Sequence, residues 1–418
     1  MLKLVLGTSG SGKTTLLYAR IRARAEAGKR SILLVPEQFT SSTEARIYRE
    51  LGDALSGMVE SYSFTSLAEH ILAIEGGAAV QTLTDAGRAV LVRRALEELQ
   101  DNVHYYYRHR RSAAFCQMAA ETIDELKSAG LSGQQLQELA RDCGTESAKL
   151  GELALIFQGY ESLLAGTGMD PADRLELAAD RLEAALARDE LPDFLREREV
   201  FIDEFDTFNA PKKRLMGAML AALPAVTVAL CEDGAPMQPG DLELFSGAKQ
   251  VAAQLRQLAR KNGAQVAAPE LLRRDLRHKD APGLAALTEL LETGSCTPPE
   301  SAPELRLFAA ASREEEARCA AAAIRRLMRQ GVRCGKIAVV CRDISLYRAA
   351  VRYEFRMAEI PLYCDEPTTP EFSAPATAVR ALLALLRGAD MTEQLTVLAK
   401  TGPVSYTHLR AHETELHL

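Results

Sequence analysis

Short apolar runs alternate with longer segments of helical periodicity along much of the chain. Each run is brief, apolar throughout and bounded by Gly, Pro or charged residues, as strands covered on both faces of a parallel sheet are. The runs are KLVLG (3–7), SILLVPE (31–37), VFIDEF (200–205), VTVALCE (226–232), LRLFAAA (305–311) and KIAVVCR (336–342).

Between these runs, apolar residues recur with the spacing of one helix face. The pattern predicts helices over 14–28, 41–55, 65–75, 84–99, 210–223, 313–330 and 345–356. Strands that alternate with helices indicate an α/β fold, in which right-handed crossovers join parallel strands.

Two interruptions in the alternation predict the domain organisation. Strand patterns vanish between about 100 and 195, and TGSCTPPESAPE (293–304) is rich in Pro and Ser, as linkers are. We therefore expect a first α/β domain built from 1–100 plus 196–235 and split by an all-helical insertion at 101–195. A helical segment and linker at 236–303 and the incomplete start of a second α/β domain at 304–403 follow.

The stretch 404–418 has no apolar periodicity and interrupts the second predicted domain. VSYTHLRAHET, which begins it, is similar to the translation of a sequencing adaptor. We expect these residues to be a non-native tail, and the native protein to continue beyond residue 403.

GTSGSGKT, residues 7–14, has the spacing GxxxxGK[ST] and stands between a predicted strand and a predicted helix. Glycines let backbone N–H groups turn inward around phosphates, the lysine supplies a charge, and the threonine hydroxyl suits Mg²⁺. The sequence therefore predicts an ATP site with Mg²⁺. Its expected members are Gly7, Thr8, Ser9, Gly10, Ser11, Gly12, Lys13, Thr14 and Thr15.

An acidic pair ends the predicted strand VFIDEF. Nucleoside triphosphatases of this class need a carboxylate for the metal at the end of a neighbouring strand. We expect Asp203 to share Mg²⁺ with Thr14, and Glu204 to orient and deprotonate the attacking water.

Composition changes this picture little. Apolar residues make up 47% and charged residues 26% of the 418 residues, which is ordinary for a globular protein, and no run of about eighteen apolar residues occurs. We expect a cytoplasmic protein with no membrane partner. The net charge of −7 excludes a histone-like basic coat but leaves room for a local basic groove. The eight cysteines form no CxxC pair, so they suggest neither zinc nor a disulfide framework.

Further segments, in order, resemble those of superfamily 1 helicases of the UvrD and RecB kind. These segments are SFTSL (63–67), DEFD (203–206), IAVVCR (337–342) and IPLY (360–363). The N-terminal phosphate loop, LLVPEQFT and LTDAGRAVLVRRAL point more narrowly to the AddB family, which belongs to the bacterial AddAB helicase–nucleases. The resemblance covers about residues 1–400 and implies a RecA-like P-loop NTPase domain, with the start of a second RecA-like domain.

The resemblance also implies roles for single residues. Arg342 matches an arginine that reaches the γ-phosphate from the second motor domain, where a guanidinium stabilises transition-state charge. Gln38, Thr40, Ser63 and Phe64 match segments that line the path of single-stranded DNA. Phe64 could stack on a base, although a buried core position is an equal alternative.

For the whole protein, the resemblance implies processing of double-strand DNA breaks for recombination repair, together with an AddA-like helicase/nuclease subunit. The nuclease domain and its iron–sulfur cluster would lie in the part missing here. VALCEDG (228–234) lacks the family's Gly-Asp-x-x-Gln pattern, and Asp206 replaces its usual Gln, so autonomous unwinding stays open. The alternative is a P-loop nucleotide-binding regulator or scaffold without motor activity.

Overall fold

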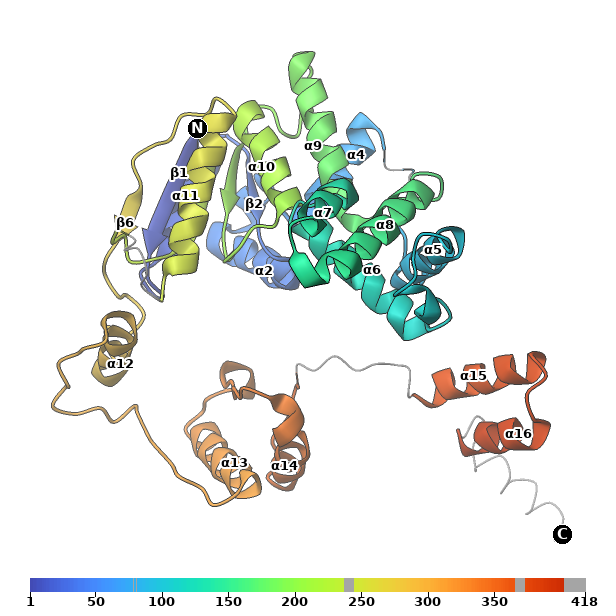
Figure 1. The fold of residues 1–418 in the computed structure, drawn as a ribbon. Helices are drawn as coiled ribbons and strands as arrows, with labels where there is room; N and C mark the ends of the chain where they lie inside the picture. Colours follow the sequence, from blue (N-terminus) through green and yellow to red (C-terminus); the bar gives the residue numbers. More distant parts are fainter. Residues whose placement is uncertain (78, 80, 237–243, 365–372, 402–418) are drawn as a thin grey trace, which may run out of the picture. The chain divides into compact units, whose positions relative to one another are not determined.

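The computed structural model describes residues 1–77, 79, 81–236, 244–364 and 373–401 (Figure 1). The chain divides into two units, Met1–Leu305 and Arg306–Leu418, and each is described by itself. The predicted non-native tail, 404–418, lies outside the described residues.

A parallel sheet of six strands forms the centre of the first unit. Its strands stand in the order β3-β2-β4-β5-β1-β6. They are β1 (Leu2–Gly7), β2 (Ser31–Leu34), β3 (Val59–Tyr62), β4 (Glu199–Ile202), β5 (Ala225–Cys231) and β6 (Glu270–Leu272). The predicted α/β class is thus confirmed, as are the strands predicted near 3–7, 31–37, 200–205 and 226–232.

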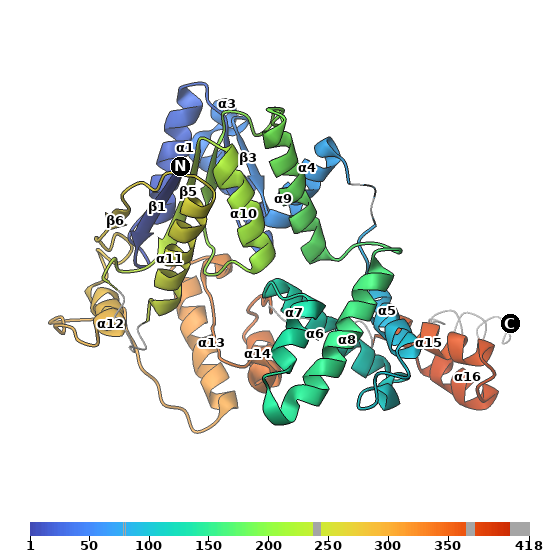
Figure 2. The same cartoon turned by 45° about the horizontal axis from the view of Figure 1, so that its top comes forward.

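Helices cover both faces of this sheet (Figure 2). One face packs against α1 (Lys13–Glu26), α2 (Thr40–Leu51) and the short α3 (Asp53–Ser56). The other packs against α4 (Phe64–Glu75), α9 (Pro171–Ala187), α10 (Ala210–Ala222) and α11 (Ser246–Lys261). Successive strand residues face opposite layers, so Leu4 and Leu6 enter one core and Val5 the other. Apolar residues on both sides explain why these strands read as continuous apolar runs.

A separate helical cluster lies between β3 and β4 in the sequence. It contains α5 (Asp85–Glu98), α6 (Ala113–Ser128), α7 (Gly133–Ala140) and α8 (Ser147–Leu164), with 3-10 turns at Tyr107–His109 and Gly144–Glu146. The cluster begins and ends earlier than the expected insertion at 101–195. Leu96 of α5 belongs to its core, whereas Ala178 and Leu182 of α9 are buried in the core of the sheet.

The remaining elements are short or belong to the second unit. The first unit also contains a 3-10 turn at Glu37–Phe39 and α12 (Pro282–Thr293). The second contains α13 (Arg313–Arg329), α14 (Ile344–Met357), α15 (Ala374–Leu386), α16 (Met391–Lys400) and a 3-10 turn at Cys334–Lys336. Ala321, Ile324, Val351 and Phe355 form the small core between α13 and α14.

The strands predicted at 305–311 and 336–342 are wrong: neither segment is a strand, and both are described throughout. A strand forms only when a neighbouring chain segment accepts and donates its backbone hydrogen bonds. Leu307 and Val340 are 99% and 91% exposed, so these apolar runs have neither a paired strand nor a covering layer in the described part of the chain.

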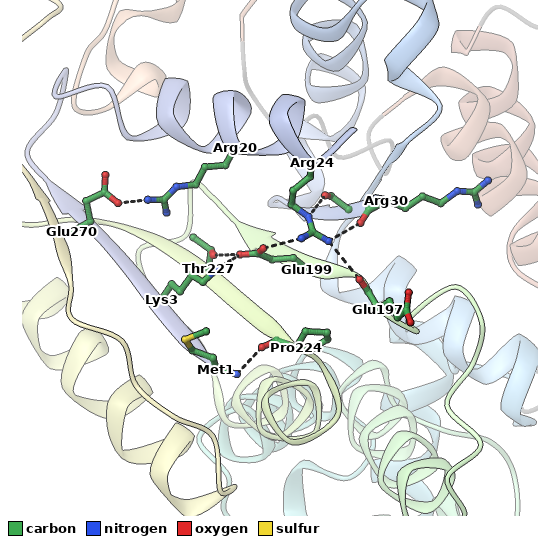
Figure 3. Close-up of polar contacts among 11 residues, drawn as sticks. Met1, Lys3, Arg20, Arg24, Arg30, Glu197, Glu199, Pro224, Thr227 and Glu270 are labelled. Atoms are coloured by element: carbon green, nitrogen blue, oxygen red, sulfur yellow. Dashed lines mark hydrogen bonds and ion pairs between the residues drawn. The ribbon is translucent and has the colours of Figure 1, made fainter. Parts of the chain in front are cut away.

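Charged side chains close the amino edge of the sheet (Figure 3). The Glu199 carboxylate, at the start of β4, accepts hydrogen bonds from Lys3 Nζ and Thr227 Oγ1 at 2.8 and 2.9 Å and pairs with Arg24 at 3.3 Å. Burial alone would raise the pKa of Glu199, but these partners outweigh it and hold that pKa below its ordinary value. This network stabilises the edge opposite the predicted nucleotide site.

Candidate functional site

The glycine-rich loop joins β1 to α1 at the carboxyl edge of the sheet. Gly10 and Gly12 adopt φ angles of +83° and +90°, which residues with a Cβ rarely adopt. Gly12 caps α1 without a side chain, and the first turn contains no acidic residue. The first backbone N–H groups of α1 therefore have no side-chain acceptor in the cap or the first turn. They are free to donate hydrogen bonds to a bound anion.

Lys13 folds back over this loop. Its Nζ atom donates hydrogen bonds to the carbonyl oxygens of Gly7 and Thr8, both at 2.8 Å. Burial lowers the pKa of Lys13 from its ordinary value. The loop thus holds a partly desolvated ammonium group bonded to neutral oxygens, and an anionic ligand would interact with it strongly.

The acidic pair stands immediately after β4. The Asp203 N–H donates to the Leu34 carbonyl at 3.1 Å, which continues the strand pairing, and the Asp203 side chain is 5% exposed. Its Oδ1 atom accepts the Glu204 N–H at 3.0 Å, and the Thr14 side chain is near enough to favour the charged form of the same carboxylate. The structure therefore brings together the two residues predicted to share a metal.

Burial raises the pKa of Asp203, although the hydrogen bonds and the charge of Lys13 act in the opposite direction. Burial and the charge of Asp203 also raise the pKa of Glu204. Glu204 adopts φ +65°, an uncommon conformation for a residue with a side chain. Two carboxylates whose charge is incompletely compensated and a strained backbone are features that gather at functional sites.

The loop and the acids do not stand on neighbouring strands, contrary to the expectation from sequence. β5 lies between them and pairs Cys231 with Gly7 of β1 and Val228 with Ile202 of β4. Since crossover connections can pass over a strand, adjacency in the sheet does not follow from the motifs.

A pocket of about 520 Å³ lies where these elements meet. Six predicted loop residues and both acids line it: Ser9, Gly10, Gly12, Lys13, Thr14, Thr15, Asp203 and Glu204. Gly7 and Thr8 instead supply the carbonyls that Lys13 contacts, and the buried Ser11 hydroxyl has no hydrogen-bond partner within the described part of the chain. The remaining lining residues are Arg46, Phe205, Asp206, Ala229, Cys231, Leu276 and Arg277.

Leu276 and Arg277 are site residues that the sequence reasoning missed. The Leu276 N–H donates to the Gly10 carbonyl at 3.0 Å, and Arg277 Nη1 donates to Ser9 Oγ at 3.2 Å. They follow β6, whose three residues are too few to show a strand pattern. The basic run RRDLRHK (273–279) was a usable signal, since a phosphate site attracts arginine.

Comparison with known proteins shows which family the chain represents. The family model described as "ADDB, N-terminal" matches residues 4–288, which include the glycine loop, the acidic pair and Arg277. The chain belongs to the AddB family.

Several AddB relatives share its sequence over most of its length. Proteins named as the B component of an ATP-dependent helicase/deoxyribonuclease, from Moorella thermoacetica and Desulforudis audaxviator, are 33% and 34% identical to it over 87% of this chain. The relative with this name from Symbiobacterium thermophilum is 32% identical over 91%. The chain spans about a third of the length of these relatives, since the matches cover 32%, 32% and 34% of them.

Two of the four predicted DNA contacts of this AddB chain are already used for packing or capping. The Ser63 hydroxyl accepts the Ser66 N–H at 3.1 Å and caps α4. Phe64 is 2% exposed and lies edge-on to Phe205 and Phe208, with ring centroids 5.3 and 6.0 Å away. The structure thus favours the core alternative for the Phe64 ring.

Gln38, Ser63 and Phe64 nevertheless line a second pocket, of about 360 Å³, together with Asn209 and Lys212. Thr40 does not line it; its hydroxyl donates to the Glu37 carbonyl at 2.9 Å. Lys212 Nζ lies 5.4 Å from the centre of the Phe205 ring, so the pocket combines a cation with aromatic walls. The contact of these residues with DNA stays a prediction.

Arg342 belongs to the second unit, where its side chain is exposed. Its contact with the γ-phosphate stays a prediction. Through the described part of the chain, each helix is too short or too polar to cross a membrane.

Proposed function

We propose that the first unit is a RecA-like P-loop domain that binds ATP with Mg²⁺ and takes part in DNA processing. The observation that supports this most is that Lys13, Thr14 and the buried Asp203 line one pocket. A hydroxyl and a carboxylate are the oxygen ligands that Mg²⁺ prefers. An uncompensated carboxylate and a desolvated ammonium are the charges that a magnesium triphosphate would satisfy.

Each residue then has a distinct task in the proposed site. The loop N–H groups and Lys13 bind phosphate oxygens, while Thr14 and Asp203 hold the metal. Glu204, whose raised pKa brings it nearer to neutral pH, positions water and accepts its proton. The bound metal would neutralise charge that develops on the phosphates.

The wider role follows from the AddB family. We propose that the whole protein is a cytoplasmic helicase and exonuclease component that processes double-strand DNA ends for recombination repair. An AddA-like helicase/nuclease subunit would be its partner. The nuclease centre and an iron–sulfur cluster would lie in the remaining two thirds of the length that the relatives have. Lys212, which lines the second pocket, supports contact with the backbone of single-stranded DNA.

Two acids beside the glycine loop favour a second candidate, a nucleotide-binding regulator or scaffold without motor activity. The charge of Glu292 acts on Lys13, and a Cβ added to Gly10 would lie 2.9 Å from the Asp275 carboxylate. Negative charge at these positions opposes a triphosphate and would weaken its binding. ATP turnover that single-stranded DNA stimulates would support the motor, whereas binding without turnover would support the regulator.

The test of the site is Lys13→Ala in the full chain, measured by calorimetric titration with ATP and Mg²⁺. Loss of the ammonium group should weaken binding by about a hundredfold or more, since a charged hydrogen bond to phosphate is worth about 1.5–3 kcal/mol and its attraction adds to this. Lys29→Ala is the matched control, because Lys29 follows the far end of α1 and lines a pocket with Arg24 and Arg198. Unchanged affinity in Lys13→Ala would refute the assignment.

A further inference from the structure

A third pocket, of about 620 Å³, adjoins the proposed nucleotide site. The two pockets share five lining residues: Thr14, Arg46, Asp203, Glu204 and Asp206. The third pocket extends along α2, where Phe39 and Arg49 also line it. Arg46 of α2 therefore stands at the junction of the two spaces.

The position of Arg46 is fixed by stacking. Its guanidinium carbon lies 4.7 Å from the centre of the Tyr18 ring, and that ring is buried against the sheet with 6% exposure. An arginine held over an aromatic face keeps its N–H groups at the rim of the guanidinium plane free to donate. Tyr18 belongs to the helix that begins at Lys13, so the stack fixes Arg46 relative to the glycine loop.

Within the described residues, the donors of Arg46 have no hydrogen-bond partner and form no salt bridge, although the charges of Asp203 and Glu204 are close enough to interact with it. Other arginines near the sheet are paired: Arg24 binds Glu199 and Arg198 binds Glu60. A guanidinium that is stacked, directed into a pocket and unpaired is suited to bind an anion.

We propose that Arg46 binds the terminal phosphate of the nucleoside triphosphate, from the side of α2. This inference rests on the proposed nucleotide site. It adds to that site a phosphate contact beyond those of the glycine loop, the acids and Arg277. Lys13 and Arg277 contact the loop itself, at Gly7, Thr8 and Ser9. Arg46 instead lines both pockets together with Glu204, and its charge acts on that acid. A contact there distinguishes a triphosphate from a diphosphate.

The test compares ATP with ADP, each titrated with Mg²⁺ into the full chain. Arg46→Met should weaken ATP binding by about tenfold, the effect of losing one charge-assisted contact, and change ADP binding less than about twofold. Arg46→Lys, which keeps the charge but not the planar fork, should lie between wild type and Arg46→Met. Arg49→Met is the matched control: it lies on the same helix and lines the third pocket but not the first, so both affinities should stay unchanged.

Equal losses for ATP and ADP, or no loss for either, would overturn the role of Arg46. If the wild-type chain bound neither nucleotide, the proposed function itself would fail instead. Thermal unfolding of each variant shows whether it is folded. If Arg46→Met is not, Arg46→Lys decides: a selective loss of ATP binding supports the contact, and an unselective or absent loss overturns it.

Discussion

The two ends of β4 place carboxylates in similarly buried positions with opposite electrostatic consequences. Glu199 at the start of the strand is 7% exposed and Asp203 just beyond its end is 5% exposed. Glu199 has Lys3, Arg24 and Thr227 around it, and its pKa is lowered. Asp203 accepts a hydrogen bond from the backbone N–H of Glu204 and has the Thr14 side chain nearby, and burial raises its pKa.

This difference separates a structural carboxylate from one suited to a ligand. Burying a charge costs free energy unless partners compensate for it, and at the amino edge the protein supplies them. At the carboxyl edge, neither the Asp203 carboxylate nor the Lys13 ammonium group is fully compensated. Burial raises the pKa of Asp203 and lowers the pKa of Lys13. A magnesium triphosphate would supply what that edge lacks.

The largest stability effect is expected at the amino edge. Glu199→Ala should lower the free energy of unfolding by about 2–3 kcal/mol, because it leaves Lys3 and Arg24 without their shared partner in a partly buried place. Urea unfolding followed by far-ultraviolet circular dichroism measures this loss. Glu98→Ala is the control, since its exposed pair with Arg94 should contribute less than about 0.5 kcal/mol. Equal effects for both variants would contradict the comparison.

The next largest effect is expected at the carboxyl edge, with the opposite sign. Asp203→Asn keeps an oxygen that can accept the Glu204 N–H, and it removes a poorly compensated charge. Without metal, its free energy of unfolding at pH 7 should equal or exceed that of wild type by up to about 1 kcal/mol. Its Mg²⁺-dependent ATP affinity should fall by about tenfold. A clear loss of stability would show that the charge is structural after all.

The smallest effect separates the two acids by pH in a chelating buffer. A carboxyl with a lowered pKa contributes stability above its unfolded pKa and loses it as pH falls through its folded pKa. The destabilisation by Glu199→Gln should therefore shrink on acidification below about pH 4.5. For Asp203 the folded pKa is raised, so the folded state takes up the proton first. The stability advantage of Asp203→Asn should shrink as pH falls from 7 towards 4. On acidification, the free energy of unfolding of the variant minus that of wild type should rise towards zero for Glu199→Gln and fall towards zero for Asp203→Asn. Changes of the same sign in the two variants would contradict the assigned directions.

The sequence predicted those parts of the fold that rest on continuous apolar runs. β1, β2, β4 and β5 are buried on both faces, and so they read as strands without any knowledge of their neighbours. β3, VESY, has two polar residues in its middle, and β6, ELL, is only three residues long. Neither segment therefore shows the continuous apolar run that predicts a buried strand. The runs at 305–311 and 336–342 had the pattern but no pairing partner among the described residues, which composition cannot reveal.

The site shows the same division between local and distant information. The glycines, Lys13, Thr14, Asp203 and Glu204 were recognisable because their chemistry is encoded within a few residues. Arg46 and Arg277 come from a helix and a loop, and packing determines how close each lies to the pocket. The order of the strands in the sheet places β5 between the strands that end at the two motifs. Contacts between residues so far apart in sequence can be seen only once the sheet is assembled, and no local pattern predicts them.

The interposed strand β5 also contributes to the lining of the pocket. It extends to Cys231, three residues beyond Val228, which pairs with the last residue of β4. Ala229 and Cys231 both line the pocket, so β5 contributes small side chains to its lining. Larger side chains at these two positions would reduce the space open to a bound molecule without altering the glycine turn or the acids.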